Sequence, residues 1–131
     1  MKEIAERFGH SLDQDDFVTT RSLLSPDCEY SIGRERLLGP AEITKSYEEN
    51  MLEGRNKLDK LTWGKSWVEP VSTSEFYVHF TDYLVHNGQN HTHKCKQKLS
   101  IENGLIVRIE HIHDEAEQGR LDSFYQLVGL K

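Results

Sequence analysis

The chain has 131 residues, a length typical of one domain that buries roughly two thirds of its unfolded surface, which leaves room for a core and a pocket. Its 22 acidic residues outnumber 16 basic ones and give a formal net charge of -6, which argues against a nucleic-acid partner. No apolar stretch is long enough to span a bilayer and residues 1–10 lack the apolar core of a signal peptide, so we expect no membrane partner and a cytoplasmic location.

The N-terminal part of the chain predicts two helices before any strand. Apolar residues at helical spacing predict a helix over residues 2–12. The acidic run at 13–16 supplies a cap and an acidic first turn for a second helix that extends through Leu24. Ser25-Pro26-Asp27 ends this second helix, because proline cannot continue it.

Two short strands and a third helix are expected next. Residues 28–32 alternate as a strand with Cys28 and Tyr30 on one side, and residues 33–38 form a turn with a second short strand. Gly39-Pro40 opens a helix that Gly54 closes. Its apolar stripe consists of Ile43, Tyr47, Asn50 and Met51.

The C-terminal half is predicted to be mainly strands. Residues 58–68 form a strand with Leu61, Trp63 and Trp67 on one face. Residues 74–114 then read as three consecutive antiparallel strands joined by two hairpin turns. A short polar helix and an apolar tail occupy residues 115–131.

The first of these hairpin turns is Asn87-Gly88, a strong hairpin signal because a type I′ turn needs positive φ at both central residues. It predicts a register in which residues equally distant from the turn face each other across the two strands. The resulting pairs are Leu84 with His91, Asp82 with His93, Phe80 with Cys95, Val78 with Gln97, and Phe76 with Leu99.

The second turn allows a two-residue loop, Asn103-Gly104, or a three-residue loop that also includes Glu102. The two-residue version would place Arg108 and Glu110 on the apolar face, because a one-residue slip turns every side chain over. We therefore predict the three-residue loop. It places Leu105, Val107 and Ile109 on the apolar face and Ile106 on the outer face.

This register predicts a polar row on the apolar face. Asp82, His93 and His113 would lie side by side across three strands, and Cys95 with His111 would form the next row. Directly opposed residues have Cβ atoms about 4.5–5.5 Å apart, within reach of side-chain hydrogen bonds. Helices followed by a curved antiparallel sheet that wraps around them make a single α+β domain over residues 1–131, with a pocket at one end of the cone.

Three stretches resemble the nuclear transport factor 2-like superfamily, which includes ketosteroid isomerase, scytalone dehydratase and the SnoaL-like polyketide cyclases. They are Leu24-Ser25-Pro26-Asp27-Cys28-Glu29-Tyr30, Leu38-Gly39-Pro40-Ala41-Glu42-Ile43, and Glu102-Asn103-Gly104-Leu105-Ile106-Val107 leading to His113-Asp114. The resemblance covers the whole chain and implies this fold and a pocket for a small molecule. It leaves the reaction to be argued from the site.

The resemblance also implies which residues replace the catalytic groups of ketosteroid isomerase. Phe8 falls where that enzyme has its oxyanion-hole tyrosine, Tyr30 where it has its general-base aspartate, and Gln97 where it has its protonated aspartate. All three positions are changed, so the ketosteroid isomerase mechanism is not expected. Scytalone dehydratase, which works with tyrosines and histidines and has an amide at the position of Gln97, suits this sequence better.

Two interpretations of the polar row remain open. In the first, Asp82 orients an imidazole of His93 or His113 that acts as general base or acid, and Tyr30 donates a hydrogen bond to a developing oxyanion. In the second, the row is a structural or solvated feature near the end of the sheet. The side chains expected to contact a ligand are Gln97, His111, Cys95, Trp63, Trp67, Phe80, Tyr47 and Phe8.

A metal site and a thiol nucleophile are further alternatives. Asp82, His93 and His113 could form a facial triad of metal ligands, although Asp82 serves equally well as a hydrogen-bond partner of His93. Cys28 and Cys95 lack metal-type spacing and are expected to be free thiols, with Cys95 and His111 as a candidate nucleophile pair. We predict no metal and no other cofactor.

The function favoured by these observations is that of a small lyase or isomerase, similar to a cyclase, acting by acid-base chemistry on a hydrophobic, carbonyl-bearing molecule. A non-catalytic ligand-binding or dimerisation module of the same fold is the alternative from another class. The predicted outer face carries an unusual number of apolar side chains, and the resemblance implies dimerisation through this face, so we expect a homodimer. The residues concerned are Tyr77, Tyr83, Val85, Ile106 and Ile112.

Overall fold

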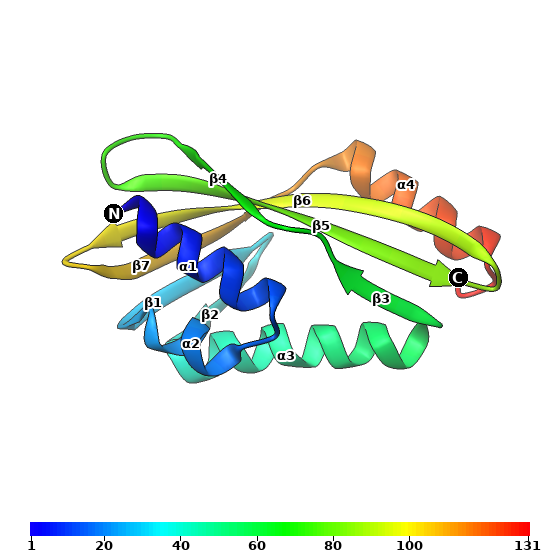
Figure 1. The fold of residues 1–131 in the computed structure, drawn as a ribbon, viewed down its shortest axis with the longest axis horizontal. Helices are drawn as coiled ribbons and strands as arrows, with labels where there is room; N and C mark the ends of the chain where they lie inside the picture. The colour runs from blue at the N-terminus through cyan, green and yellow to red at the C-terminus, as the bar shows by residue number, and fades with distance from the viewer.

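The computed structural model describes all residues 1–131, as four helices and seven strands (Figure 1). The helices are α1 (Lys2–Asp13), α2 (Phe17–Ser22), α3 (Pro40–Lys57) and α4 (Glu115–Leu127). The strands are β1 (Leu24–Ile32), β2 (Glu35–Leu38), β3 (Lys60–Trp63), β4 (Trp67–Pro70), β5 (Glu75–His86), β6 (Gln89–Glu102) and β7 (Leu105–Ile112). None of the helices is both long and apolar enough to cross a lipid bilayer.

Several helix boundaries follow local signals. The prediction that the second helix extends through Leu24 and is ended by Ser25-Pro26-Asp27 was wrong, because α2 ends at Ser22 and Leu24–Ile32 already forms β1. The side chain of Asp16 caps α2 by accepting a hydrogen bond from the backbone N–H of Thr19, and Pro40 occupies the first turn of α3. The prediction that Gly54 ends α3 was wrong, because the helix continues to Lys57. Gly54 lies against β3: a Cβ atom there would lie 2.6 Å from Cδ2 of Leu61, so a larger residue would require the Leu61 side chain to shift.

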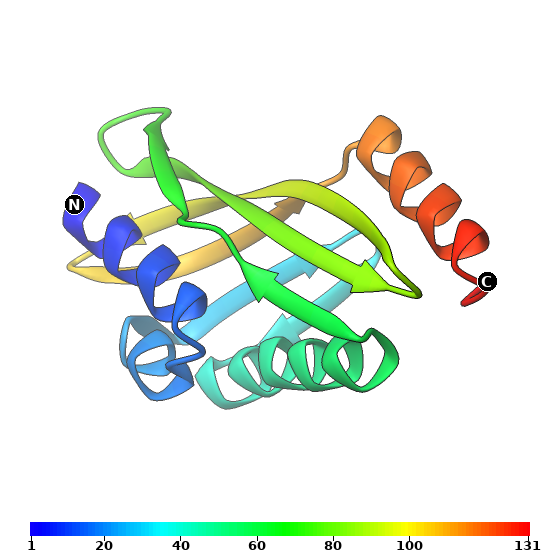
Figure 2. The ribbon, with the colours of Figure 1, turned by 45° about the vertical axis from the view of Figure 1, so that its right-hand side comes forward.

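All seven strands form one curved sheet in the order β2-β1-β7-β6-β5-β3, with β4 also paired to β5 (Figure 2). Every neighbouring pair is antiparallel except β1 and β7, which run parallel. Helices α1 and α3 pack against this sheet, and α4 packs against β6. The fold is therefore the predicted α+β arrangement, in which a curved, unclosed sheet wraps around helices.

The register of the β5–β6 hairpin is the predicted one. Asn87 and Gly88 both have positive φ and form the two-residue turn, and Asp82 lies opposite His93 as expected. The odd-numbered residues of β6 face the core, so Gln97 and Leu99 are buried. The Asn-Gly signal was sufficient because nothing interrupts the ladder between Glu75 and Ser100.

The predicted three-residue loop between β6 and β7 was wrong. The turn contains only Asn103 and Gly104, and a β-bulge follows, since Ile101 faces Ile106 while Ser100 faces Arg108. Val107 is the extra residue of this bulge. Ile106, which was expected on the outer face, is completely buried.

The predicted continuous strand over residues 58–68 is two strands separated by Gly64, Lys65 and Ser66. The break changes the phase of the side chains. Val68 lies opposite Val78, which is a core residue, while Trp67 lies opposite His79. Trp67 is therefore not on the face of Leu61 and Trp63 but is 56% exposed and stacked on the His79 ring with centroids 3.8 Å apart.

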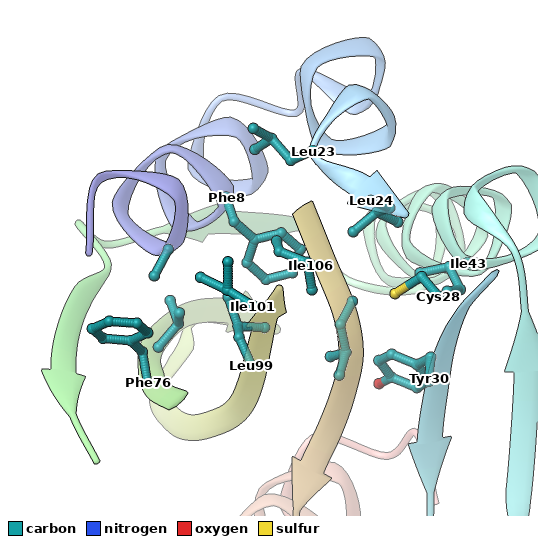
Figure 3. Packing of buried hydrophobic residues seen from close by; sticks show 13 residues of the cluster. Phe8, Leu23, Leu24, Cys28, Tyr30, Ile43, Phe76, Leu99, Ile101 and Ile106 are labelled. Atoms are coloured by element: carbon teal, nitrogen blue, oxygen red, sulfur yellow. The ribbon is translucent and has the colours of Figure 1, made fainter. Parts of the chain in front are cut away.

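The hydrophobic core lies between α1, α3 and the inner face of the sheet (Figure 3). Its buried residues include Phe8 from α1, Ile43 from α3 and Ile106 from β7. A second, smaller cluster joins α4 to the far end of the sheet through Leu84 and Phe124. The space between the two clusters holds the candidate site.

Candidate functional site

A cavity of about 270 Å³ opens between the two hydrophobic clusters. Its walls come from the connection between α1 and α2, from α3, from β3, β5 and β6, and from α4. Twelve of its 20 lining residues are hydrophobic, so a small number of polar side chains stand out against an apolar surface. That composition is typical of a small-molecule site, although the volume is slightly below the usual 300–1,000 Å³.

Asp82, on β5, is the most perturbed acid in the cavity wall. It lies between Trp63 of β3 and His93 of β6 in the sheet, so neighbouring strands cover it on both sides. Burial raises the pKa of Asp82 to about 7, and no hydrogen bond or opposite charge offsets this effect. At neutral pH the carboxyl group is therefore poised between its acidic and basic forms.

Gln97 and Tyr47 form a polar pair deeper in the wall. The Tyr47 hydroxyl on α3 donates a hydrogen bond of 2.6 Å to Oε1 of Gln97 on β6. This contact fixes the orientation of the amide. The Nε2 group of Gln97 makes no hydrogen bond within the protein and is available as a donor. Burial raises the pKa of Tyr47 well above its usual value, so its hydroxyl stays protonated.

Cys95 is a neutral thiol in this environment. Burial first, and then the negative charge of Asp82, raises the pKa of Cys95 to about 12. A thiolate is therefore not formed near neutral pH, and the candidate nucleophile pair of Cys95 with His111 lacks the activation it would need.

His93 meets α4 rather than Asp82. Its Nδ1 atom lies 3.7 Å from Oε2 of Glu117, which is too long for a hydrogen bond, and this nitrogen is buried without a partner. Burial lowers the pKa of His93 even though Glu117 opposes that change. His93 is therefore a neutral imidazole at the junction of the cavity wall and α4.

A second polar network holds one edge of the cavity. Asp15, which has a positive φ of 55°, accepts a hydrogen bond of 2.8 Å from Nε1 of Trp63 and forms a 2.7 Å ion pair with Arg55. The guanidinium group of Arg55 also lies over the Trp63 ring, 5.4 Å from its centroid. These contacts tie the α1–α2 connection to α3 and β3 and fix the Trp63 ring in the cavity wall.

Three solved structures place this arrangement among known folds, whereas no protein-family model and no curated protein sequence matches the chain. A nuclear transport factor 2-like protein of unknown function from Burkholderia pseudomallei is 18% identical, with 91% of this chain and 94% of that one covered and a TM-score of 0.67. This chain has the nuclear transport factor 2-like fold.

Two further structures share this fold. A candidate polyketide cyclase from Pseudomonas putida is 18% identical, with 89% of this chain and 93% of that chain covered and a TM-score of 0.65. TerC, co-crystallised with polyporic acid, is 17% identical, with 92% and 96% covered and a TM-score of 0.68. These identities establish the nuclear transport factor 2-like fold and leave the activity to the site.

Seven of the residues that the sequence nominated line the cavity of this nuclear transport factor 2-like fold. They are Asp82, His93, Gln97, Cys95, Trp63, Phe80 and Tyr47. The structure thus brings together side chains from α3, β3, β5 and β6, and the positions of those on β5 and β6 follow the predicted register. Their roles in binding or catalysis remain predictions.

The predicted row of Asp82, His93 and His113 is not formed. The bulge at Val107 moves β7 two residues along β6, so His111 lies opposite Gln97 instead of Cys95. His113 lies beyond the end of β7 and is exposed, and neither histidine lines the cavity. His111 is half-buried with Nδ1 unpartnered, and burial lowers its pKa.

Three other candidates lie outside the cavity. Phe8 is fully buried in the core, where its ring packs edge-on against Tyr47 and Phe80. Tyr30 is also a core residue, and burial raises its pKa to about 12 (Figure 3). The exposed Trp67 lies on the outer face. None of the three lines the cavity, so their predicted contacts with a ligand are not supported.

Sequence reasoning missed the contribution of α4. Leu121 and Tyr125 line the cavity, and Glu117 approaches His93. The pattern that could have revealed this face is the i, i+3, i+4, i+7 spacing of Leu121, Phe124, Tyr125 and Val128, which indicates an amphipathic helix. The prediction that Phe124, Tyr125 and Leu127 belong to an apolar tail after a short polar helix was wrong, because all three lie within α4.

The prediction that the protein carries no stoichiometric transition metal is best tested with a chelator. No group of three His, Cys, Asp or Glu side chains is placed to hold a metal ion, and His113 is separated from the proposed triad. We expect EDTA to leave the thermal midpoint unchanged. One equivalent of zinc, iron or nickel by elemental analysis, lost in His93→Ala, would contradict the prediction.

Proposed function

We propose that this protein binds a small, apolar, carbonyl-bearing molecule in its cavity and catalyses an isomerisation, elimination or cyclisation that begins with proton removal by Asp82. The observation that carries the proposal is the unpartnered, buried carboxyl group of Asp82, with a pKa of about 7, in an apolar cavity wall. Carboxylates with raised pKa values in apolar sites are effective general bases near neutral pH.

The arrangement supports a simple sequence of steps. A carboxylate oxygen of Asp82 takes a proton from the carbon next to the substrate carbonyl. The electron pair of that C–H bond forms a C=C bond to the carbonyl carbon, and the π pair of the carbonyl moves onto its oxygen. The free Nε2 group of Gln97 donates a hydrogen bond to the resulting enolate, and Tyr47 holds the amide in place. The protonated Asp82 then returns the proton to another atom of the substrate, or the enolate expels a leaving group or attacks a second carbonyl.

Proton exchange tests this proposal without knowledge of the natural substrate. We choose 2-acetonaphthone, an uncharged aromatic ketone with exchangeable protons beside its carbonyl, and follow its deuteration in D₂O by NMR at pH 8. The wild-type protein is expected to accelerate exchange above the buffer rate. Asp82→Asn should remove this acceleration by about 100-fold or more, the usual effect of losing a general base.

A matched control distinguishes loss of the base from loss of a negative charge. Glu53→Gln removes a carboxylate of α3 that is exposed and lies outside the cavity lining, so exchange should remain at the wild-type rate. Gln97→Leu should slow exchange by less than Asp82→Asn, because it removes one hydrogen-bond donor. An Asp82→Asn protein that exchanges the ketone as fast as wild type would refute the proposal.

A non-catalytic ligand-binding protein is the second candidate. This alternative is favoured by the state of His93, whose Nδ1 has no hydrogen-bond partner to orient the ring. Asp82 is then the one acid-base group of the cavity, and no oriented histidine passes protons to or from it. In that case 2-acetonaphthone would quench the fluorescence of Trp63 on binding but would not exchange its protons faster than in buffer.

The homodimer expected from the sequence remains a prediction. The outer face of the sheet exposes Trp67 and Tyr83, at 56% and 44%, and includes Tyr77 beside His79. Burial of these aromatic groups would favour association. Light scattering at micromolar concentration should give the mass of two chains, and Trp67→Ser with Tyr83→Ser should shift the mass toward one chain. A wild-type mass of one chain would contradict it.

A further inference from the structure

The charged side chains that line the cavity are acidic. Asp13, Asp15 and Asp82 belong to the lining, which contains no lysine and no arginine. The only basic side chain in the lining is His93, and burial lowers its pKa, so it is uncharged at neutral pH. No positive charge therefore faces the interior of the cavity.

Two cations that contact lining residues, Arg55 and Lys57, are already engaged. Nη1 of Arg55 is paired with Asp15 at 2.7 Å, and its Nε donates to the backbone carbonyl of Leu61. The Nζ atom of Lys57 lies over the Tyr125 ring, 4.4 Å from its centroid, and this exposed lysine does not line the cavity. Neither group is available as a counter-ion for a bound anion.

The three acidic groups differ in how far they are neutralised. Asp13 accepts hydrogen bonds from the backbone N–H and the hydroxyl of Ser66, at 2.9 and 2.8 Å. Asp15 is held by Arg55 and Trp63. Asp82 has no such partner, so its charge, when present, acts directly on the contents of the cavity.

We propose that the cavity accepts ligands without a carboxylate or phosphate group, and that Asp82 is the residue that rejects such anions. The inference rests on the proposed function in taking this cavity as the binding site. Two like charges a few ångströms apart in a medium of low dielectric constant repel strongly. The substrate class is thereby narrowed to uncharged carbonyl compounds, such as ketones, esters and lactones.

The rejection of anions should depend on pH, because proton binding by Asp82 and anion binding in the cavity are thermodynamically linked. An anion can enter the cavity only if Asp82 first binds a proton, so the affinity for anions should rise as the pH falls through about 7. The affinity for an uncharged ligand of the same shape should change much less over the same range. The groups that face Asp82 from neighbouring elements are His93 and Cys95 of β6 and Tyr125 of α4, all uncharged near neutral pH.

The test compares two probes that share one ring system, 2-acetonaphthone and 2-naphthoate, by titration of the intrinsic fluorescence. Naphthoate remains ionised at both pH values used, 8.5 and 6.5. At pH 8.5 the ketone should bind at least about tenfold more tightly than naphthoate, and at pH 6.5 this ratio should fall to about threefold or less. Asp82→Asn should give the small ratio at pH 8.5 as well, and Glu53→Gln should retain the large one.

The outcomes separate this inference from the proposed function. Naphthoate that binds wild type at pH 8.5 as tightly as the ketone, or a ratio that persists in Asp82→Asn, overturns the charge selection alone. A ketone that binds with the expected selectivity but is not deuterated overturns the catalytic proposal and leaves the selection standing. If neither probe binds at either pH, both are overturned, because the cavity is then not a site for molecules of this kind.

Discussion

Asp82→Asn is expected to raise the free energy of unfolding by about 2–4 kcal/mol at pH 8 and to leave it nearly unchanged at pH 4. Burial raises the pKa of this carboxyl group from 3.8 to about 7 in the folded protein. Between those two values the folded chain retains a proton that the unfolded chain has released. Ionisation of Asp82 therefore destabilises the fold increasingly as the pH rises toward 7, and by a constant amount above it.

Urea denaturation of wild type and Asp82→Asn at pH 4, 6 and 8 measures this difference. Each pair of curves is compared at one pH, so the contributions of all other titrating groups cancel. Glu53→Gln is the control, because an exposed carboxylate should give no gap that widens with pH. An Asp82→Asn protein that is less stable than wild type at pH 8 would mean that the carboxylate has a partner in the fold, and its assignment as a free base would fail.

A group that destabilises the folded protein at the pH where it works is typical of functional sites. Replacement of Asp82 by a hydrophobic residue would suit the apolar wall formed by Phe80, Leu84 and Trp63 better than a carboxylate does. The fold gains no hydrogen bond or ion pair from Asp82. Stability therefore does not account for a carboxyl group at this position, and the role proposed for Asp82 in the cavity would.

The position of Asp82 opposite His93 was predictable because a single local signal fixed it. Asn87-Gly88 sets the turn, and the ladder from His86 to Glu75 contains no irregularity. The same argument failed in the next hairpin because Leu105, Ile106 and Val107 are all apolar, and the pattern cannot reveal which one is the extra residue of a bulge.

The wrong prediction of the β6–β7 turn changed the partners of the β7 residues on β6. The observed register of β7 against β6 differs from the predicted register by two residues. Because this number is even, Ile109 and His111 keep the face that was predicted for them. Their positions along β6 nevertheless differ by two residues, which removes His113 from the site. For the residues of β7 that follow the bulge, the face was thus predicted correctly and the partners on β6 were not.

Packing between distant parts of the chain accounts for the remaining differences. Trp67 lies on the other face because the strand breaks at Gly64, and non-local contacts stabilise this break. The Gly64 N–H donates a hydrogen bond to the carbonyl of Thr81, and a Cβ atom at Gly64 would lie 3.1 Å from the Tyr83 ring. The contact between Glu117 and His93 likewise depends on where α4 docks. Neither contact leaves a local signal in the sequence.

Acidification from pH 7.5 to 5.5 is expected to release α4 from the sheet and so to open one wall of the cavity. The ring of Phe124 on α4 stacks on His91, with centroids 5.2 Å apart, and Glu117 approaches His93. Each imidazole has a buried nitrogen without a hydrogen-bond partner, Nε2 in His91 and Nδ1 in His93, and Nδ1 of His111 is a third such atom nearby. Protonation of His93 would bury an unsatisfied charge beneath the helix.

The direction of the effect follows from the pKa shifts. Burial lowers the pKa of His93 and of His111 below 6.5, and for His93 it outweighs the opposing effects of Glu117 and Asp114, with His91 and Arg120 lowering the pKa further. These histidines therefore bind fewer protons when α4 is docked than when it is released. Its docking is fully stable above about pH 6.5 and weakens as the pH falls below that value.

Amide hydrogen exchange, corrected for the intrinsic dependence on pH, gives the measurement. Amides of α4 should lose protection at pH 5.5, whereas those in the middle of β5 should keep it, because only α4 is docked through these histidines. In His93→Gln, which cannot gain a charge, the loss should be smaller. His10→Gln, an exposed histidine on α1, should behave as wild type. Protection of α4 that stays constant or increases on acidification would show that the ion pair between protonated His93 and Glu117 outweighs the burial of charge, and the histidine contacts would then fasten the helix at low pH instead of releasing it.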